Sequence, residues 1–347
     1  MWAALVSAAA SLLVSACLTA AARRFALRRG MLDVPNARSS HQRATPRGGG
    51  IAIVITVSVM TLMLALAGMV ARNFCVALLG GGVLVAAVGF VDDRRALPAS
   101  VRFAAQTLAT AWALWWIGGL TQLQMGGQVV HPGWPGALIA ALGILWTMNL
   151  FNFMDGIDGL AAAEAVFVAG AGAVLAAVAG HGAIAAVAWV LAWASAGFLC
   201  WNWPPARIFM GDVGSSYLGY AIALLALGDV QSQPAAVWVW LILGGVFFVD
   251  ATVTLVRRWL RRERVSQAHR QHAYQWLARR FGHRPVTIGV LLVDLLWLFP
   301  CALLASRQPP LATATVIGAL LPLVVVALRA GAGRREVATL SGREGCP

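Results

Sequence analysis

The chain has 347 residues, of which 60% are hydrophobic and 11% are charged, and its mean hydropathy is +0.77. So few polar residues cannot cover the surface of a soluble domain, which excludes a soluble protein and predicts a polytopic membrane protein. The formal net charge is +13, and all 26 basic residues are arginine, which excludes a lysine nucleophile or a Schiff base. We expect no nucleic-acid partner.

Apolar runs of roughly 17 to 25 residues, the length that spans a bilayer as a helix, recur along the chain. There are about eleven such runs, which predicts an all-α integral membrane protein with one transmembrane domain over residues 1–329. Residues 330–347 form a basic cytoplasmic tail that we expect to be disordered. The predicted spans begin near Trp2, Gly50, Phe74, Val101, Pro135, Gly159, Ala183, Gly214, Pro234, Val286 and Pro309.

The arginines lie almost entirely on alternate connecting segments. Only Arg72 and Arg307 fall elsewhere. By the positive-inside rule, the arginine-rich segments are cytoplasmic, which places the N-terminus outside and the C-terminus inside. The first span is followed by its arginines rather than preceded by them, so we expect it to be retained and not cleaved as a signal peptide. The other 24 arginines lie in segments 23–47, 92–102, 202–213, 257–285 and 329–347.

Five of the 13 acidic residues form three small clusters at predicted cytoplasmic ends of spans: Asp92 with Asp93, Asp155 with Asp158, and Asp212. Adjacent carboxylates repel one another unless they share a cation or a proton. The Asp92–Asp93 pair therefore suits a magnesium ion or a cationic partner, or else forms a solvated helix end. If the fold brings the three clusters together, they can hold a divalent cation at the membrane surface.

Four polar residues, Asn149, Asn152, Asp155 and Asp158, stand three residues apart at the end of the fifth span. Neighbours at this spacing can touch on a helix. The glycines that follow are weak helix formers, so we expect the amides on the last turns of the span and the carboxylates on the next turn. Polar residues at a membrane edge indicate a reaction centre, and the alternative is interhelical hydrogen bonding by Asn with helix capping by Asp.

Three further segments carry polar chemistry. Asp212 stands between two glycines directly before the eighth span, where it could cap the helix, bind a metal ion, or do both. The Thr45–Gly50 loop is rich in glycine, which is weak evidence for a phosphate site because it does not fit the P-loop pattern. The arginine-rich loop before His269 and His272 could anchor anionic lipid or bind phosphate and sugar oxygens.

Taken together, these motifs resemble those of the polyprenyl-phosphate N-acetylhexosamine-1-phosphate transferases, which are integral membrane enzymes. The form of the His loop resembles the bacterial enzymes that initiate O-antigen or related surface polysaccharides. The motifs are RSSH at 38–41 with TPRGGG at 45–50, the Asp92–Asp93 pair, NFMDGIDGLA from Asn152, FMGDVGS from Phe209 and HRQH from His269.

The resemblance implies transfer of a sugar 1-phosphate from a UDP-N-acetylhexosamine to undecaprenyl phosphate, at the cytoplasmic face of the bacterial inner membrane. It implies that Asn152 and Asp212 bind Mg²⁺, with Mn²⁺ as an alternative. The acidic residues that it implicates in acceptor handling and catalysis are Asp92, Asp93, Asp155 and Asp158. The residues expected to contact substrates are Arg102, Asn149, Phe209, which would stack on the uracil, His269, Arg270 and His272.

Several alternatives stay open at this point. A UbiA-like membrane prenyltransferase also uses acidic motifs at a membrane face, and a proton-coupled transporter would use membrane acids as an ion path. The donor could be UDP-GlcNAc, UDP-N-acetylfucosamine or UDP-N-acetylquinovosamine. Direct attack of the acceptor is favoured over a covalent aspartyl-phosphate intermediate, and the enzyme could act as a homodimer among the membrane lipids.

Overall fold

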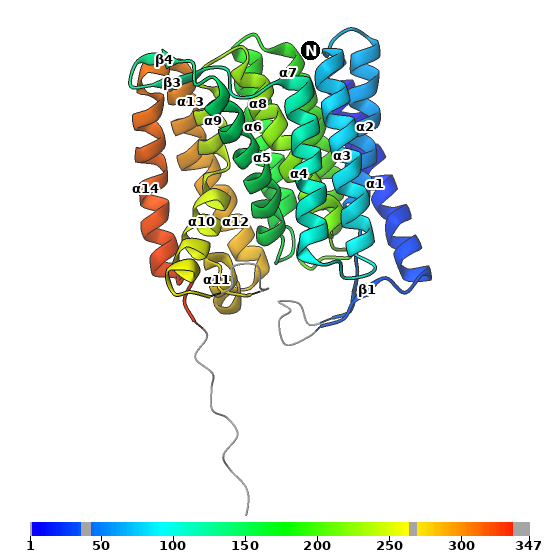
Figure 1. The fold of residues 1–347 in the computed structure, drawn as a ribbon. Coiled ribbons are helices and arrows are strands. Elements are labelled where there is room, and N and C mark those ends of the chain that lie inside the picture. Colours follow the sequence, from blue (N-terminus) through cyan, green and yellow to red (C-terminus); the bar gives the residue numbers. More distant parts are fainter. Residues whose placement is uncertain (1, 36–42, 264–268, 336–347) are drawn as a thin grey trace, which may run out of the picture.

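The structure is a computed structural model that describes residues 2–35, 43–263 and 269–335. In this part of the chain the helices run side by side in one bundle, and two antiparallel β-ribbons lie at its opposite ends (Figure 1). The first eight helices are α1 (Trp2–Arg28), α2 (Ile51–Leu66), α3 (Arg72–Asp92), α4 (Ala99–Ile117), α5 (Trp134–Met154), α6 (Leu160–Val178), α7 (Gly182–Asn202) and α8 (Asp212–Val230). They are followed by α9 (Ala236–Leu243), α10 (Gly245–Leu260), α11 (Ala273–Phe281), α12 (His283–Val293), the π-helix η1 (Asp294–Leu298), α13 (Phe299–Arg307), the 3-10 helix η2 (Pro309–Leu311) and α14 (Ala312–Ala330).

The predicted all-α membrane architecture is confirmed, but the predicted number of spans is not confirmed. Each of the eleven predicted positions coincides with a helix or a helix pair. Eight helices of the described residues are long and apolar enough to cross a membrane, and the pair α9 and α10, bent by 77°, would make nine. The 16-residue α2 and the more polar α4 fall outside this set, so a count of eleven spans is not established.

Helix α8 lies at the centre of the bundle. In its most apolar stretch 89% of the residues are buried, against 22% in α1 and in α14. Glycines let α8 approach its neighbours closely, since a Cβ on Gly219 would lie 2.3 Å from the carbonyl oxygen of Thr147 in α5. On its other side, the hydroxyl of Tyr220 donates to the carbonyl of Ala77 in α3 at 2.9 Å. The middle of α8 therefore packs closely between α3 and α5.

The segment 257–285, expected to be a loop, contains the nine-residue helix α11. This helix is amphipathic, because Ala273, Tyr274 and Ala278 are buried while Arg279 and Arg280 face out. At the opposite end of the bundle, the connection between α4 and α5 forms a hairpin of β3 (Leu123–Met125) and β4 (Gln128–Val130). The sequence signal that could have predicted α11 is its amphipathic pattern rather than its mean hydropathy.

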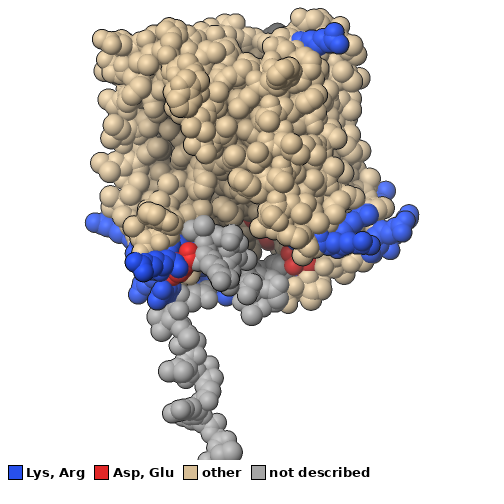
Figure 2. Space-filling model, in the orientation of Figure 1, with Lys and Arg blue, Asp and Glu red and all other residues tan. Residues whose placement is uncertain are grey.

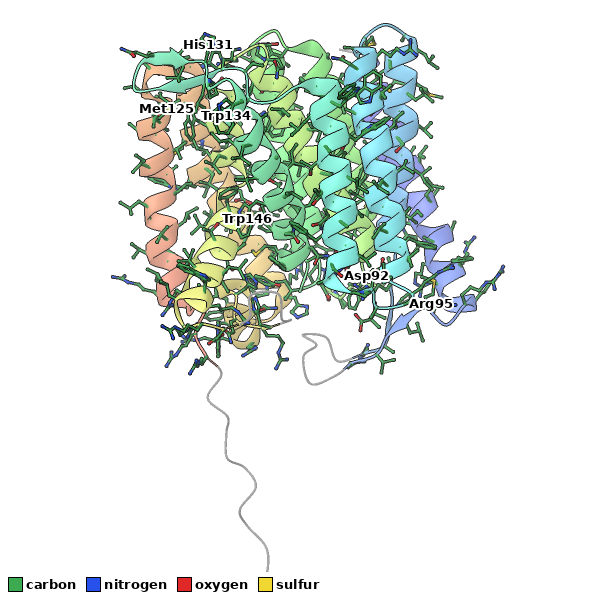
Figure 3. All side chains as sticks on the ribbon, in the orientation of Figure 1. Asp92, Arg95, Met125, His131, Trp134 and Trp146 are labelled. Carbon is green, nitrogen blue, oxygen red and sulfur yellow. The ribbon has the colours of Figure 1, made fainter. Side chains whose placement is uncertain are left out.

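Charged side chains gather at one end of the bundle (Figure 2). Asp92 and Arg95 lie at this end, whereas Met125, His131 and Trp134 lie at the other (Figure 3). The asymmetry is the one that the arginine pattern predicts, and the sidedness in the membrane stays a prediction. Of the predicted tail, residues 331–335 pack against α10, where Arg257 donates to the carbonyl of Ala332 at 2.6 Å, and the rest lies outside the described residues.

Candidate active site

Asp93, the residue that follows α3, holds the beginning of α8. Its carboxylate accepts the backbone N–H groups of Asp212 at 2.8 Å and Val213 at 3.3 Å. These N–H groups have no partner within their own helix, so Asp93 caps α8 from a different helix. Gly211 has φ +76°, and a Cβ there would lie 2.3 Å from the Asp93 carboxylate. Burial raises the pKa of Asp93 to about 6, although Arg47 lowers it.

The TPRGGG loop reaches this junction through backbone hydrogen bonds. Strand β2 (Thr45–Pro46) pairs with β1 (Leu32–Asp33), and the carbonyl of Pro46 accepts the N–H of Phe209 at 2.8 Å. The N–H of Gly49 then donates to the carbonyl of Phe209 at 2.9 Å. Two segments that are far apart in sequence thus run side by side, and Arg47 is carried to the start of α8.

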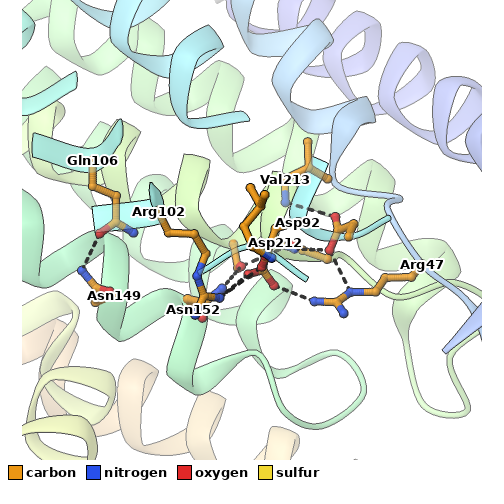
Figure 4. A network of polar contacts seen from close by, with 12 residues as sticks. Arg47, Asp92, Arg102, Gln106, Asn149, Asn152, Asp212 and Val213 are labelled. Carbon is orange, nitrogen blue, oxygen red and sulfur yellow. Dashed lines mark hydrogen bonds and ion pairs between the residues drawn. The ribbon is translucent and has the colours of Figure 1, made fainter. Parts of the chain in front are cut away.

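Two arginines converge on the carboxylate of Asp212 (Figure 4). Nη2 of Arg47 lies 2.6 Å from Oδ1, and Nη1 of Arg102 lies 3.2 Å from Oδ2. Each arginine also binds a second carboxylate, Asp93 at 2.8 Å for Arg47 and Asp92 at 3.1 Å for Arg102. The arginine side chains are 34% and 38% exposed, whereas the three carboxylates are exposed by 12% or less. The network therefore presents guanidinium groups to an incoming ligand.

Asn149 and Asn152 lie on the last turns of α5, as predicted. The amide of Asn149 donates to Oε1 of Gln106 in α4 at 2.9 Å and to the carbonyl of Leu145 at 2.7 Å. This is the interhelical bond that the sequence left open as an alternative, and substrate binding by Asn149 stays a prediction. The amide of Asn152 donates to the hydroxyl of Ser215 at 3.2 Å, one turn into α8, which brings Asn152 to the Asp212 network.

Asp155 and Asp158 lie in the turn after α5 and differ in their partners. Asp158 accepts the N–H of Ala206 at 3.0 Å and lies 3.3 Å from Nδ1 of His283 in α12. Among the described residues, the carboxyl of Asp155 has no hydrogen-bond partner. Burial raises its pKa to about 7, and nearby carboxylates add to the rise while Arg47 opposes it. Asp155 is thus the carboxyl that is most available to a new partner.

The His loop packs against the end of α5. His272 is buried, its Nδ1 lies 3.3 Å from Oδ1 of Asp250, and its ring stacks on that of His269 at 4.9 Å between centroids. His269 is half-buried, and burial together with the nearby His272 and Arg258 lowers its pKa to about 3. A neutral imidazole is therefore expected at His269, whereas His272 supports the loop from inside.

The remaining predicted contacts lie at the same end of the molecule. Phe209 and Arg270 are both half-buried, and the carbonyl of Arg270 accepts a hydrogen bond from Arg279 at 3.0 Å. The RSSH motif at 38–41 lies outside the described residues. The contacts of Phe209 and Arg270 with substrates, like those of Arg102 and His269, stay predictions.

The chemistry of this end fits a hard divalent cation. Asp212 offers a carboxylate and Asn152 an amide oxygen, which are donors that Mg²⁺ prefers. No group of three or more His, Cys, Asp or Glu residues in the described ranges is arranged to hold a metal ion. Mg²⁺ commonly takes only one or two carboxylates from the protein and completes its shell with water and phosphate oxygens, so a smaller donor set is what such a site needs.

Sequence reasoning missed four residues that build the site: Arg47, Gln106, Asp250 and Tyr274. Arg47 lies inside a motif that was noted only for its glycines. Gln106, a polar residue four positions after Arg102 on an apolar helix, could have been found by helical spacing. Asp250 and Tyr274 act only through the position of α11, which the sequence pattern did not identify.

Comparisons with known proteins identify the family of the chain. The model of glycosyl transferase family 4 matches residues 74–228. The chain is 30% identical to the probable undecaprenyl-phosphate N-acetylglucosaminyl 1-phosphate transferase of Bacillus subtilis, over 85% of this chain and 83% of that protein. It is 34% identical to the phospho-N-acetylmuramoyl-pentapeptide-transferase of Moorella thermoacetica, over 61% and 69% of the two chains.

A third relative is the decaprenyl-phosphate N-acetylglucosaminephosphotransferase of Mycolicibacterium smegmatis, which is 33% identical over 61% of this chain and 55% of its own. All three relatives bear names of enzymes that transfer a phosphosugar, and the first matches along most of both chains. The resemblance of the sequence motifs is thereby confirmed. The chain belongs to glycosyl transferase family 4, the polyprenyl-phosphate N-acetylhexosamine-1-phosphate transferases.

Proposed function

We propose that the protein transfers N-acetylhexosamine 1-phosphate from a UDP-sugar to undecaprenyl phosphate and releases UMP. The product would be the lipid-diphosphate sugar that initiates O-antigen or cell-envelope polysaccharide synthesis at the bacterial cytoplasmic membrane. The observation that carries the proposal is the network around Asp212, which presents two partly exposed arginines at one end of a membrane bundle. Membership of the family supports this reading over a prenyltransferase or a transporter.

In the proposed reaction, an oxygen of the acceptor phosphate attacks the β-phosphorus of the donor. The bond between the β-phosphorus and the oxygen that bridges to the α-phosphate breaks, and UMP leaves. Phosphoryl transfer depends mainly on positioning and on neutralising charge, with little covalent work for the protein. A dense set of arginines and carboxylates at a fixed junction of three helices suits that requirement.

We assign to Asn152 and Asp212 the binding of Mg²⁺, with Mn²⁺ as the alternative. When bound, the cation would supply neutralising charge to the donor diphosphate. Arg47 and Arg102 would bind phosphate oxygens, because a guanidinium pairs with phosphate in the same forked geometry that it uses for carboxylate. Both arginines are exposed by about a third, so a ligand can reach them without unfolding the junction.

The carboxylates take different roles in this proposal. The second pKa of a phosphate monoester is about 6, so the acceptor is mostly dianionic at neutral pH and needs little help from a base. Asp92 and Asp93 are bound to arginines and to backbone N–H groups, and they would position the substrates and the start of α8. Asp155, which has no hydrogen-bond partner among the described residues, is the carboxyl most able to meet a substrate, while Asp158 holds the turn.

The polyprenyl chain needs an apolar path that leads to this end of the bundle. A cavity of about 290 Å³ is lined by apolar residues of α5, α8, α9 and α10. It passes beside the bend at Gly244 and reaches Phe151, one residue before Asn152. We propose that the first isoprene units of the acceptor lie here, which would place its phosphate beside Asn152.

For the donor, we propose that Phe209 stacks on the uracil and that His269 and Arg270 contact the sugar phosphate. UDP-GlcNAc is the first donor to test, because the relatives from Bacillus subtilis and Mycolicibacterium smegmatis carry N-acetylglucosamine in their names. UDP-N-acetylfucosamine and UDP-N-acetylquinovosamine are the alternatives. Whether the protein forms a homodimer can be tested on the same purified protein by measuring its mass in detergent.

The test is UMP release by the purified protein with undecaprenyl phosphate, Mg²⁺ and each of the three donors. We expect release that requires both the lipid and the cation, and that is fast with one donor. Asp212→Asn is the variant to compare, and Asp229→Asn is its matched control, because it removes a carboxylate from the opposite end of the same helix. Lipid-independent release, or no release from folded protein with any donor, would contradict the proposal.

A further inference from the structure

Asp250, near the middle of α10, is the anchor of the His loop. Its buried carboxylate accepts the backbone N–H groups of Ala273 at 2.9 Å and Tyr274 at 3.0 Å, which open α11. The same carboxylate lies 3.3 Å from Nδ1 of His272 and accepts the hydroxyl of Thr254 at 3.1 Å. Three of these donors lie at Oδ1 and one at Oδ2, and the Asp250 side chain is only 6% exposed, so its hydrogen bonds are made within the protein.

A carboxylate on Nδ1 fixes the ring of His272. Because Asp250 can only accept when it is ionised, it selects the state of His272 in which Nδ1 carries the proton. The fixed ring stacks between Phe153, at 6.3 Å, and His269, at 4.9 Å between centroids. His272 is only 2% exposed, so it contacts substrates through its neighbour and not directly.

His269 is the member of this stack that a ligand can reach. It is half-buried, and its Nδ1 is a buried polar atom without a hydrogen-bond partner among the described residues. An unsatisfied buried polar atom costs free energy unless another group binds it. Because Nδ1 is buried, the part of His269 that the loop offers to a ligand is the exposed remainder of its ring.

A second contact joins α11 to the catalytic end of α5. The hydroxyl of Tyr274 donates to the carbonyl of Phe153 at 2.9 Å. A Cβ on Gly156 would lie 2.1 Å from this hydroxyl, so the glycine of the MDGIDG motif leaves the space that Tyr274 fills. The position of His269 is thereby tied to the turn that carries Asp155.

We infer that Asp250 is a positioning residue for donor recognition, which sets His269 over the site by fixing His272 and the start of α11. The inference rests on the proposed function for the identity of the donor, a UDP-sugar. It assigns no chemical step to Asp250. Its consequence is that loss of the Asp250 carboxylate weakens the donor site and leaves the acceptor site, which is lined by α5, α8, α9 and the start of α10, in place.

Asp250→Asn is the variant that separates these effects. The amide oxygen can still accept from Ala273, but its NH₂ group faces the N–H of Tyr274, so two donors oppose each other and the start of α11 loosens. We expect KM for the UDP-sugar to rise about tenfold, the factor that corresponds to one hydrogen bond to a charged group. KM for undecaprenyl phosphate should stay unchanged. Thr254→Val, which removes one hydroxyl from the same carboxylate, is the control and should behave as wild type.

Tyr274→Phe keeps the inference testable if Asp250→Asn fails to fold. It removes only the hydroxyl that joins α11 to Phe153, and it should raise KM for the donor in the same direction by a smaller factor. Equal effects on the two KM values, or a fall in kcat alone, would overturn the inference.

Amide hydrogen exchange gives a readout that does not depend on the reaction. In Asp250→Asn the peptide 269–281 should exchange faster than in wild type, while the start of α8 should not change. Unchanged exchange overturns the anchoring role of Asp250 whatever the enzyme does. Faster exchange in Asp250→Asn, together with no UMP release by the wild-type protein, would instead count against the proposed function. Faster exchange in Asp250→Asn with an unchanged KM for the donor would overturn the role of Asp250 in donor recognition.

Discussion

The two ends of α8 each hold a buried aspartate, and the partners of the two carboxylates differ. Asp229 lies 2.5 Å from Nδ1 of His181 and accepts the indole N–H of Trp240 at 2.9 Å. Both partners are mostly buried, since the His181 side chain is 15% exposed and Trp240 is 4% exposed. Asp212 is bound by Arg47 and Arg102, whose exposed guanidinium groups could exchange the carboxylate for phosphate. Burial of an acidic residue therefore does not identify the active site. The active site is identified by charged partners that can be exchanged for a ligand.

The largest expected effect separates the two ends directly. Asp212→Asn should lower kcat by about 10³-fold, because it removes a cation ligand and the centre of the charge network. Asp229→Asn should retain most of the activity and lose thermal stability, since it weakens the bond to His181. UMP release and the melting temperature measure the two effects. Similar losses of kcat in both variants would contradict the distinction between the two ends of α8.

The arginines should show the next largest effect. Arg47→Gln and Arg102→Gln should each lower kcat/KM by about 10²-fold, because each guanidinium would contact phosphate in the transition state. Since both bind Asp212, the double variant should lose less than the product of the two single losses. Arg72→Gln, at the other end of α3, is the matched control. Strict additivity in the double variant would show that the two arginines act separately.

Asp92→Asn tests whether the Asp92 carboxylate positions the acceptor phosphate or removes a proton from it. The Asp92 carboxylate is bound to Arg102 and to the N–H of Leu97 at 2.6 Å, so we expect impaired positioning to lower kcat/KM by about tenfold. The loss should be uniform between pH 6 and about pH 9, because the acceptor phosphate ionises near pH 6 without help. A loss confined to low pH would instead identify Asp92 as a general base.

The smallest expected effect is that of Asp155→Asn on the stability of the protein and on the pH dependence of that stability. Its pKa in the folded protein is about 7, above its ordinary value of 3.8, so the folded state binds the proton more tightly than the unfolded state. The free energy of unfolding should then fall as pH rises from about 4 through 7. Asp155→Asn removes this loss, and its melting temperature should exceed that of wild type at pH 8 by more than at pH 5. An equal difference at both pH values would contradict the burial of this carboxyl.

Much of the site followed from residue type and spacing. The amides at the end of α5, the carboxylates after it, and the meeting of the acidic clusters at one end all depend on local helix geometry and on the arginine pattern. The span count was less predictable, because α2 is short, α4 is polar, and α9 and α10 bend at a glycine. The bend at Gly244 leaves the apolar run unbroken, so hydropathy alone counts α9 and α10 as an ordinary span.

The residues that sequence reasoning missed share one property. Arg47 and Asp250 act through backbone pairing and helix placement that join segments more than twenty residues apart. The run of glycines after Arg47 gave no sign that its loop pairs with Phe209. A lone aspartate near the inner end of an apolar span, with a His loop following, is the pattern that would have identified Asp250.

The most direct measurement follows the two phosphates of the donor. The purified protein is given undecaprenyl phosphate, Mg²⁺ and UDP-GlcNAc, or whichever donor releases UMP, with the label in either the α- or the β-phosphate. We expect the β-label in the lipid product and the α-label in UMP. Retention of both labels in UDP would mean that the sugar moves without its phosphate, which would contradict attack at the β-phosphorus and the role given to the network around Asp212.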